Sequence, residues 1–177
     1  MKTYWTTTGF GFKLFASFIL VLCLPACRSR KADPVFLERK EWLEIELKLG
    51  VQIADRSDLP YYREVINWLG VPYKFGGSSF QGTDCSGLVM VVYERVFGKK
   101  LPRQSAKQAD FANRIQKNKL VPGDLYFFDI NGKGISHIGM HLGGDKFIHA
   151  STQKGVIVSD LEEAYYKRTF VGYGRCR

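Results

Sequence analysis

The sequence of 177 residues contains few of the side chains that bind metal ions, with only four cysteines and three histidines. It has no Cys-x-x-Cys pair and no His-Glu-x-x-His motif, which argues against the common zinc sites. Internal repeats and low-complexity tracts are also absent, and the composition is that of a globular protein, 45% hydrophobic and 24% charged. A chain of this length accommodates one domain of ordinary size with a leader and a linker.

The apolar run near the N-terminus is too short to cross a bilayer. It covers residues 14–24, follows only two charges (Lys2 and Lys13), and has the length of a signal-peptide h-region. Residues 24–27, Leu-Pro-Ala-Cys, resemble a bacterial lipobox. That resemblance implies cleavage before Cys27 and acylation of its sulfur, and several acyl chains would anchor the protein firmly. The alternative is an ordinary secretory signal with a coincidental cysteine.

Acidic residues are outnumbered, 17 against 26 lysines and arginines, which gives a net charge of +9. A basic chain is compatible with a polyanionic partner. The sequence carries no DNA- or RNA-binding motif, and its leader predicts export to the cell envelope, where cell wall and lipid head groups are the polyanions. Nucleic acid is therefore not an expected partner.

Cys85 has the sequence context of a catalytic nucleophile. The turn-forming residues Gly82 and Asp84 precede it, and a helix-compatible segment runs from it to about residue 97, where Gly98 stops the helix. At a helix N-terminus the dipole favours the thiolate, which is the nucleophilic form, and a neighbouring imidazole would lower the thiol pKa further. The alternative is a buried cysteine that acts as a small hydrophobic residue.

All three histidines lie in one segment with a period of two, typical of an antiparallel hairpin. A three-residue loop at 142–144 would pair His141 with Asp145 and therefore His137 with His149, about 5 Å apart on one face. A helix-borne cysteine needs a base, and the base needs an orienting group, so we expect His137 and His149 in these two roles. His141, nearer the loop, is read as peripheral, and zinc binding by Cys85 with the three histidines is the chemical alternative.

The remaining segments predict a mixed α and β chain. Residues 34–49 favour a helix capped by Asp33, although periodicity alone does not separate helix from strand there. Further helices are expected at 60–69 and from about 105 to 112, with an extended segment at 71–77. Strands are expected at 125–128, 156–159 and 169–174.

Six short motifs occur in a fixed order: Pro-Tyr at 72–73 with Gly-Gly at 76–77, Thr-Asp-Cys-Ser-Gly at 83–87, Leu-Pro-Arg at 101–103, Pro-Gly-Asp-Leu at 122–125, Ser-His-Ile-Gly at 136–139 and Phe-Ile-His-Ala at 147–150. Together they resemble the NlpC family of papain-like cell-wall cysteine peptidases, over roughly residue 58 to the C-terminus. The order of leader, lipobox and single catalytic domain is similar to the small lipoproteins of that family.

The resemblance implies an α+β fold with a papain-like core, in which the nucleophile-bearing helix packs on an antiparallel β-sheet. The expected domains are a signal peptide (1–26), a lipidated tether with a helical extension (27–57) and the catalytic domain (58–177). Two departures stand out. His141 occupies a position where the family commonly has an aromatic residue, and no SH3-type wall-binding module precedes residue 58.

The resemblance also implies roles for individual residues: Cys85 as nucleophile, His137 as general base and then acid, and His149 as its orienting group. Backbone N–H groups near Cys85 would hold the oxyanion, with the Tyr73 hydroxyl close by. Asp84 and Ser86 would help to bind the substrate. From the residues alone, Tyr73 is equally a core aromatic and Asp84 a helix cap. No cofactor and no metal are expected.

The implied function is hydrolysis of an amide bond in peptidoglycan stem peptides, most specifically the D-glutamyl–diamino acid bond, by a monomeric lipoprotein held to the bilayer through acylated Cys27. Arg28 lacks the aspartate associated with inner-membrane retention, which favours the outer membrane, facing the periplasm, in a cell that has one. The alternatives are a non-catalytic wall-binding or scaffold lipoprotein, and an amidase or acyltransferase acting on another amide or on lipid. After processing, Cys85 and Cys176 are the remaining thiols, and Cys176 is expected to be a bystander rather than a disulfide partner.

Overall fold

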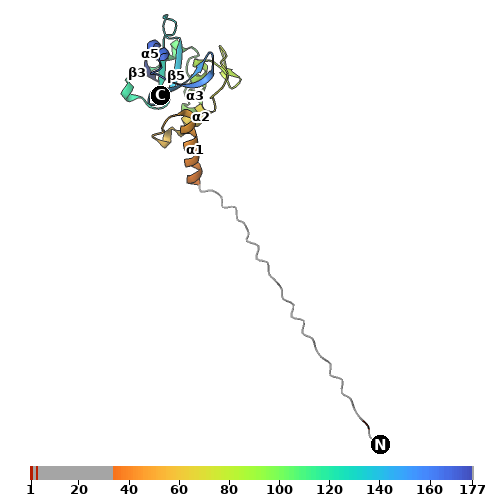
Figure 1. Cartoon of the computed structure of the whole chain (residues 1–177). Helices are drawn as coiled ribbons and strands as arrows, with labels where there is room; N and C mark the ends of the chain where they lie inside the picture. Colours follow the sequence, from red (N-terminus) through yellow and green to blue (C-terminus); the bar gives the residue numbers. More distant parts are fainter. Residues whose placement is uncertain (2, 4–33, 177) are drawn as a thin grey trace. The chain divides into compact units, whose positions relative to one another are not determined.

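The computed structural model describes residues 1, 3 and 34–176, with side chains described from residue 38 in the first helix (Figure 1). Apart from residues 1 and 3, the predicted signal peptide lies outside the described residues, and so does Cys27. Within the described part of the chain, no helix has the length and apolarity needed to cross a membrane.

The fold combines short helices with one large antiparallel sheet, which confirms the predicted α+β class. The six strands of the sheet follow the order β3-β8-β4-β5-β6-β7, and a two-stranded ribbon, β1-β2, precedes the third helix. The elements are α1 (Pro34–Leu49), η1 (Arg56–Asp58), α2 (Leu59–Ile66), β1 (Ser78–Ser79), β2 (Gly82–Thr83), α3 (Cys85–Phe97), α4 (Ser105–Phe111), β3 (Asn113–Ile115), η2 (Lys117–Lys119), β4 (Leu125–Phe128), β5 (His137–Gly143), β6 (Lys146–Ser151), β7 (Gly155–Asp160), α5 (Ala164–Thr169) and β8 (Phe170–Arg175).

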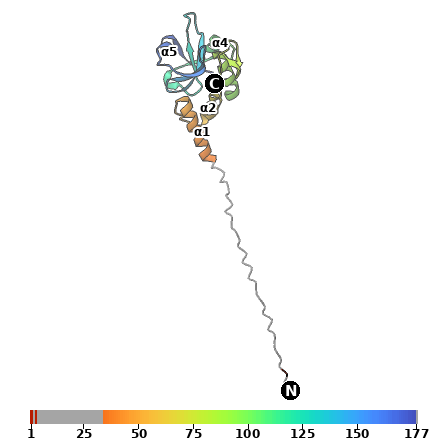
Figure 2. The same cartoon turned by 45° about the vertical axis from the view of Figure 1, so that its right-hand side comes forward.

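The sheet has a hydrophobic cluster on each face, because successive residues of a strand point to opposite sides. In β4, Leu125 and Phe127 join the main core, which also contains residues of α2, α3 and α4. Tyr126 and Phe128 belong to a second, largely aromatic cluster that includes Tyr166 of α5. Figure 2 accordingly shows α4 and α5 on opposite sides of the sheet. The helix that begins with Cys85 packs on β5 and β6, as predicted.

Local signals explain the bounds of α3. Asp84 has extended backbone angles, and its Oδ1 accepts a hydrogen bond of 2.8 Å from the Gly87 N–H, the geometry of a side-chain N-cap. Gly98 ends the helix in the left-handed conformation, with φ of 63°. The helix predicted from Cys85 to residue 97 is therefore confirmed.

The predicted register of the β5–β6 hairpin is wrong. His141 pairs with Phe147 rather than Asp145, and a register shift follows between His141 and Gly143. Gly143 and Gly144 have φ of 138° and 57°, so the chain turns later than a three-residue loop at 142–144 would allow. The pairing moves by two residues, which keeps each side chain on its predicted face. His137 and His149 are therefore not directly opposite each other, as predicted, but diagonal neighbours on the same face of the sheet.

The segment before residue 58 contributes to the main core. The predicted helix to Leu49 is confirmed as α1, which lies beside α2 in Figures 1 and 2. Ile45 and Leu49 of α1 are buried in this core, and so are Val51 and Ile53 in the segment between α1 and η1. The domain boundaries given above stay predictions.

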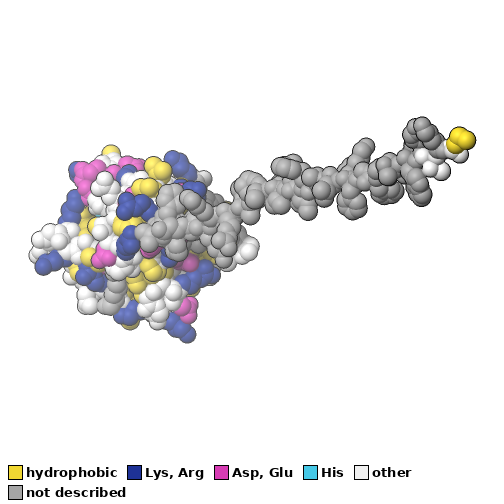
Figure 3. All heavy atoms as spheres, turned by 90° about the horizontal axis from the view of Figure 1, so that it is seen from below, with side chains coloured by type: hydrophobic (Ala, Val, Ile, Leu, Met, Phe, Trp, Pro, Cys, Tyr) yellow, Lys and Arg dark blue, Asp and Glu magenta, His cyan; other side chains and the backbone are white. Residues whose placement is uncertain are grey.

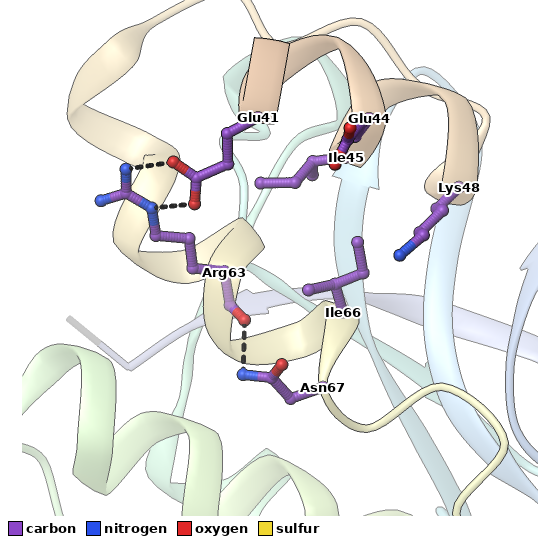
Figure 4. Close-up of a pocket in the computed structure, with 7 residues that line it drawn as sticks. All are labelled: Glu41, Glu44, Ile45, Lys48, Arg63, Ile66 and Asn67. Atoms are coloured by element: carbon purple, nitrogen blue, oxygen red, sulfur yellow. Dashed lines mark hydrogen bonds and ion pairs between the residues drawn. The ribbon is translucent and has the colours of Figure 1, made fainter. Parts of the chain in front are cut away.

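A pocket between α1 and α2 lies apart from the predicted site residues. Figure 4 shows Arg63 of α2 and Glu41 of α1 joined by two hydrogen bonds, each 2.7 Å long. This ion pair is exposed, so it contributes little to stability. None of the residues predicted to act in catalysis or substrate binding lines this pocket.

Positive charge is scattered on the face shown in Figure 3. Lys and Arg side chains there lie among Asp and Glu side chains rather than in one patch. The net charge of +9 is therefore not concentrated on this face into the continuous basic surface that binds nucleic acids.

Candidate active site

Cys85 lies in a cleft of about 340 Å³ at the N-terminus of α3. The cleft brings together four residues predicted from the sequence: Tyr73, Asp84, Cys85 and Ser86. The rest of its lining is Phe75, Gly76, Arg103, Gln104, Ser105 and Ser136. The presence of Ser136, the residue before His137, shows that the histidine strand reaches this cleft.

Asp84 is tied to Arg103 by a bidentate ion pair, with Oδ1–Nη1 and Oδ2–Nη2 distances of 2.8 and 2.7 Å. The same carboxylate accepts the N–H groups of Gly87 and Gly76, each at 2.8 Å. Burial opposes ionisation, but these hydrogen bonds hold the pKa of Asp84 below its usual value. Asp84 is thus a helix cap that also fixes the loop around Gly76 to the start of α3.

Arg103 is a site residue whose role the sequence reasoning missed. Besides Asp84, it donates to Ser86 Oγ at 2.9 Å and to the Gly77 carbonyl at 3.1 Å. Its motif, Leu-Pro-Arg, was visible in the sequence, but the pairing joins residues 19 positions apart and no local pattern indicates it. This cluster of Arg103 with Asp84, Ser86 and Gly77, the Arg103 clamp, joins the loop at Gly77 to the start of α3 at the edge of the cleft.

The Cys85 thiol is buried, with 9% of the residue exposed. Burial, together with the negative charge of Asp84, raises the thiol pKa to about 11. Backbone N–H groups of Ile138, Ser86 and Cys85 oppose this rise. The sequence-based expectation of a stabilised thiolate is not met in this structure, because desolvation is the larger effect and Asp84 offsets the positive end of the helix.

His137 and His149 are hydrogen-bonded, with His137 Nε2 and His149 Nδ1 2.9 Å apart. Both are buried, at 8% and 2% exposure, beside the aromatic cluster formed around Phe128 and Phe147. Burial lowers the pKa of His137 to about 4, and burial and the neighbouring His137 lower that of His149 as well. The pair is therefore neutral near pH 7. The predicted arrangement of a histidine with a second histidine as its partner is present.

His137 is the first residue of β5, and both of its neighbours in the chain approach Cys85. Ser136 lines the cleft, and the Ile138 N–H is directed to the cysteine sulfur. Sheet and nucleophile helix thus meet at this end of β5. A thiol at the N-terminus of α3 and a neutral imidazole pair at the start of β5 are the types of group that nucleophilic acyl transfer uses.

His149 has two further partners that the sequence reasoning did not find. Its Nε2 lies 3.1 Å from Ser159 Oγ and 3.1 Å from Tyr166 Oη. Ser159 belongs to β7, beside β6, so strand parity could have indicated it. Tyr166 comes from the six-residue helix α5, which no local sequence pattern predicted.

His141 is a buried structural residue, which agrees with its interpretation as a residue peripheral to the chemistry. It is buried, stacks on Tyr126, and its Nδ1 lies 2.9 Å from Tyr126 Oη. The three histidines therefore do not converge on Cys85. Among the residues described, no group of three or more His, Cys, Asp or Glu side chains has the geometry to hold a metal ion.

Cys85 and Cys176, the two cysteines within the described part of the chain, are both free thiols. Cys176 is buried in the main hydrophobic core. Burial raises the pKa of its thiol to about 11, so it carries no reactive thiolate near neutral pH. The expectation of an unpaired bystander agrees with this position.

The model of the NlpC/P60 family matches residues 70–175, which contain the cleft, the clamp and the histidine pair. The chain belongs to the NlpC/P60 family. The predicted resemblance is confirmed, and with it the class of the protein, a cell-wall peptidase.

Two curated relatives and one crystal structure illustrate the extent of the likeness. Over 153 residues the chain is 35% identical to the "Probable endopeptidase NlpC" of Escherichia coli K12, covering 86% of this chain and 92% of that protein. It is 38% identical over 104 residues to the E. coli K12 "Murein DD-endopeptidase MepS/Murein LD-carboxypeptidase", covering 59% and 55% of the two chains. A Staphylococcus aureus structure described as similar to lipoprotein, NLP/P60 family, matches with a TM-score of 0.61 and 32% identity, over 70% of this chain and 42% of that one.

Proposed function

We propose that this NlpC/P60 chain hydrolyses an amide bond in the stem peptides of peptidoglycan, with Cys85 as nucleophile, His137 as general base and His149 as the orienting group. The observation that carries the proposal is the 2.9 Å contact between His137 and His149, formed where β5 meets the cleft of Cys85. The names of the curated relatives support the substrate class, since one is a murein endopeptidase.

The reaction begins from neutral partners, because burial raises the Cys85 pKa and lowers the His137 pKa. The Nε2 atom of His137 is bonded to His149, which leaves Nδ1 to accept the thiol proton. As the proton moves to the imidazole, the sulfur attacks the carbonyl carbon, so a free thiolate need not accumulate. His149 accepts the Nε2–H of the new imidazolium and keeps the ring oriented.

The tetrahedral intermediate carries its negative charge on the former carbonyl oxygen. Backbone N–H groups at the start of α3 supply hydrogen bonds there. Burial raises the pKa of Tyr73, so its hydroxyl keeps its proton and can also donate. Collapse of the intermediate transfers the His137 proton to the leaving amine and leaves a thioester on Cys85. Water, deprotonated by His137, then hydrolyses the thioester and releases the carboxylate product.

The walls of the cleft suit a charged peptide. Tyr73 offers a hydroxyl group, and Ser86 Oγ, which donates to Asp84 and accepts from Arg103, has one lone pair left to accept from a substrate. Asp84 and Arg103 place both charge signs at the cleft. Stem peptides carry carboxylates and amines close to the scissile bond, so these groups would orient them. We assign substrate binding to Tyr73, Asp84 and Ser86, with the D-glutamyl–diamino acid bond as the expected target.

The decisive experiment is mass spectrometry of purified muropeptides after incubation with the wild-type protein, the Cys85→Ala variant and the Cys176→Ala variant. Cleavage by the wild type and by Cys176→Ala, but not by Cys85→Ala, supports the proposal, and the product masses identify the bond. Absence of cleavage of muropeptides and intact sacculi by the wild type overturns it. Cys176→Ala is the matched control, since it removes a buried thiol outside the cleft.

The non-catalytic alternative makes the opposite prediction in cells. A scaffold or wall-binding lipoprotein would still complement a deletion strain when Cys85 is replaced by alanine, whereas a peptidase would not. An amidase or acyltransferase would lose activity with Cys85→Ala but act on other amides or on lipids, which a substrate panel separates.

Anchoring is a separate part of the proposal. We place an acylated Cys27 in the bilayer, with the catalytic domain on the periplasmic side of an outer membrane where the cell has one. The lipobox-like sequence at residues 24–27 supports this, as does the description of the S. aureus neighbour as similar to lipoprotein. The domain itself is expected to act as a monomer.

A further inference from the structure

We infer that Ser159 and Tyr166 form the outer end of the histidine relay: they fix the proton of His149 on Nε2, and through His149 they keep Nδ1 of His137 free to accept the Cys85 proton. The two are positioning residues, since neither lines the cleft that holds Cys85. The inference rests on the proposed function and adds two residues to it.

The contacts form a continuous chain across three strands and a helix. His137 on β5 bonds His149 on β6, and the far nitrogen of His149 lies 3.1 Å from Ser159 on β7. Tyr166 on α5 lies 3.1 Å from the same nitrogen, and Ser159 Oγ donates to Tyr166 Oη at 3.4 Å. Ser159 and Tyr166 are themselves buried, at 7% and 8% exposure. Bulk water therefore does not provide the partner of His149 Nε2.

Because the group that orients His137 is itself a histidine, His149, a further residue must set the position of its proton. A carboxylate can only accept a hydrogen bond, so an aspartate in this place would by itself force the tautomer of the base. A neutral histidine has one donor and one acceptor nitrogen, and it can present either to His137. Something beyond His149 must therefore decide which nitrogen carries its proton.

The required arrangement follows from the chemistry at Cys85. His137 Nδ1 must lack a proton in order to act as a base, so the His137 proton lies on Nε2 and is donated to His149 Nδ1. His149 must then carry its own proton on Nε2 and donate it to a hydroxyl oxygen. With the Ser159 proton directed to Tyr166, the lone pairs of Ser159 Oγ are available to accept it.

Tyr166 completes the arrangement because its hydroxyl can accept from both His149 and Ser159. Tyr166 and Ser159 also line a polar cavity of about 420 Å³, which shares no residue with the Cys85 cleft. The Tyr166 proton can be directed into this cavity, which is also lined by Glu163 and Gln153. The opposite polarity, with Tyr166 donating to His149 Nε2, would put the His149 proton on Nδ1 and leave His137 in the wrong tautomer.

The test is ¹⁵N NMR of histidine-labelled full-length protein, which reports directly which ring nitrogens carry protons. We expect Nε2–H on both His137 and His149 in the wild type. Detection of Nδ1–H on His149 in the wild type overturns the inference without any variant. Because the spectrum requires no substrate, a failure of the peptidase proposal is distinguishable from a failure of this one.

Steady-state kinetics of variants provide a second test. The double variant Ser159→Ala/Tyr166→Phe removes both hydroxyls, and we expect a mixture of tautomers. We expect kcat to fall by about 10- to 100-fold with KM unchanged, the range found when the hydrogen-bond partner that orients a metal-binding histidine is lost. Tyr165→Phe, the same change at the neighbouring position on α5, is the matched control and should alter neither quantity. Unchanged tautomers and kcat in the folded double variant overturn the inference. Should that variant not fold, the wild-type spectrum still decides.

Discussion

Arg103 and Asp84 are joined by two hydrogen bonds of 2.8 and 2.7 Å, and this pair fixes the residue that precedes Cys85. The pairing matters because Asp84 also caps α3 and accepts the N–H of Gly76 in the opposing loop. One carboxylate thus positions both walls of the cleft. Burial opposes ionisation of Asp84, but Arg103 and the two backbone N–H groups together hold the pKa of this carboxyl group below its usual value.

The first prediction follows from this clamp. Replacing Arg103 with alanine leaves the buried Asp84 carboxylate with two backbone N–H groups and the Ser86 hydroxyl as its partners. We expect the free energy of unfolding to fall by about 2 kcal/mol, typical of a lost hydrogen bond to a charged group. Muropeptide cleavage should fall more than 10-fold, because the cleft loses its support. Chemical denaturation and muropeptide assays measure the two effects.

Arg63→Ala is the control for this prediction. Arg63 makes an ion pair with Glu41 between α2 and α1, and the two side chains are 48% and 43% exposed. An exposed pair of this kind contributes about 0 to 1 kcal/mol. Equal losses of stability in the Arg103 and Arg63 variants would contradict a special role for the clamp.

A second prediction concerns the close contact between α3 and the Tyr73 loop. A Cβ atom at Gly87 would lie 2.1 Å from the carbonyl oxygen of Gly77. Because that oxygen belongs to the backbone, it cannot move away by a side-chain rotation. Gly87→Ala should therefore destabilise the fold by about 3 kcal/mol, at the upper end of overpacking effects, and displace the oxyanion donors. Thermal unfolding and cleavage rates provide the measurement.

Gly98→Ala separates crowding from backbone strain. Gly98 has φ of 63°, but a Cβ there meets no atom within 4 Å. The cost should be only about 1 kcal/mol, from the left-handed conformation alone, with cleavage unchanged. A Gly87 variant as stable and active as the Gly98 variant would show that the loop at Gly77 moves away from the added Cβ atom at little cost in free energy.

The pH dependence of Cys85 gives a third prediction. Because burial raises the pKa of the thiol to about 11 and lowers that of His137 to about 4, the resting pair is uncharged between these values. In the Cys176→Ala background, the rate of Cys85 alkylation by iodoacetamide should rise about 10-fold for each pH unit through neutrality, as the thiolate fraction rises. A plateau between pH 5 and 8 would instead reveal a preformed thiolate–imidazolium pair.

Protonation of His137 should also affect stability. Its pKa is lowered from 6.5 in the unfolded chain to about 4 in the folded protein, so the unfolded state binds more protons between these values. Above pH 6.5, His137 is neutral in both states and does not reduce the free energy of unfolding. Below pH 6.5 the free energy of unfolding falls with pH, with a slope of up to about 1.4 kcal/mol per pH unit. Urea unfolding between pH 4 and 7 measures the slope, and His137→Gln should reduce it. An unchanged slope in that variant would locate the effect elsewhere.

The parts predicted from the sequence are those controlled by short-range signals. Asp84 and Gly98 delimit α3 because capping depends on residues within one helical turn. The common face of His137 and His149 followed from strand parity, which survived the register error because the shift was two residues. The error itself arose at Gly143 and Gly144, whose positive φ values permit more than one turn.

The parts that could not be predicted depend on contacts distant in sequence. Tyr166 and His149 are 17 residues apart, and the helix that carries Tyr166 has only six residues. The direction of the Cys85 pKa shift likewise depends on burial under the sheet, which no local pattern reports. A helix N-terminus predicted a thiolate from one favourable effect, while the folded environment adds a larger unfavourable one.

The last prediction concerns His149 itself, whose role can be separated from its bulk. His149→Asn retains a side chain that can accept from His137, whereas His149→Ala leaves the His137 Nε2–H without a partner in a buried site. We expect kcat to fall about 100-fold or more with alanine and to recover in part with asparagine, while KM stays constant, since His149 does not line the cleft. The measurement is steady-state cleavage of a stem-peptide substrate, with folding checked by circular dichroism. Equal activity of the alanine and wild-type proteins would mean that His137 needs no orienting group and would remove His149 from the mechanism.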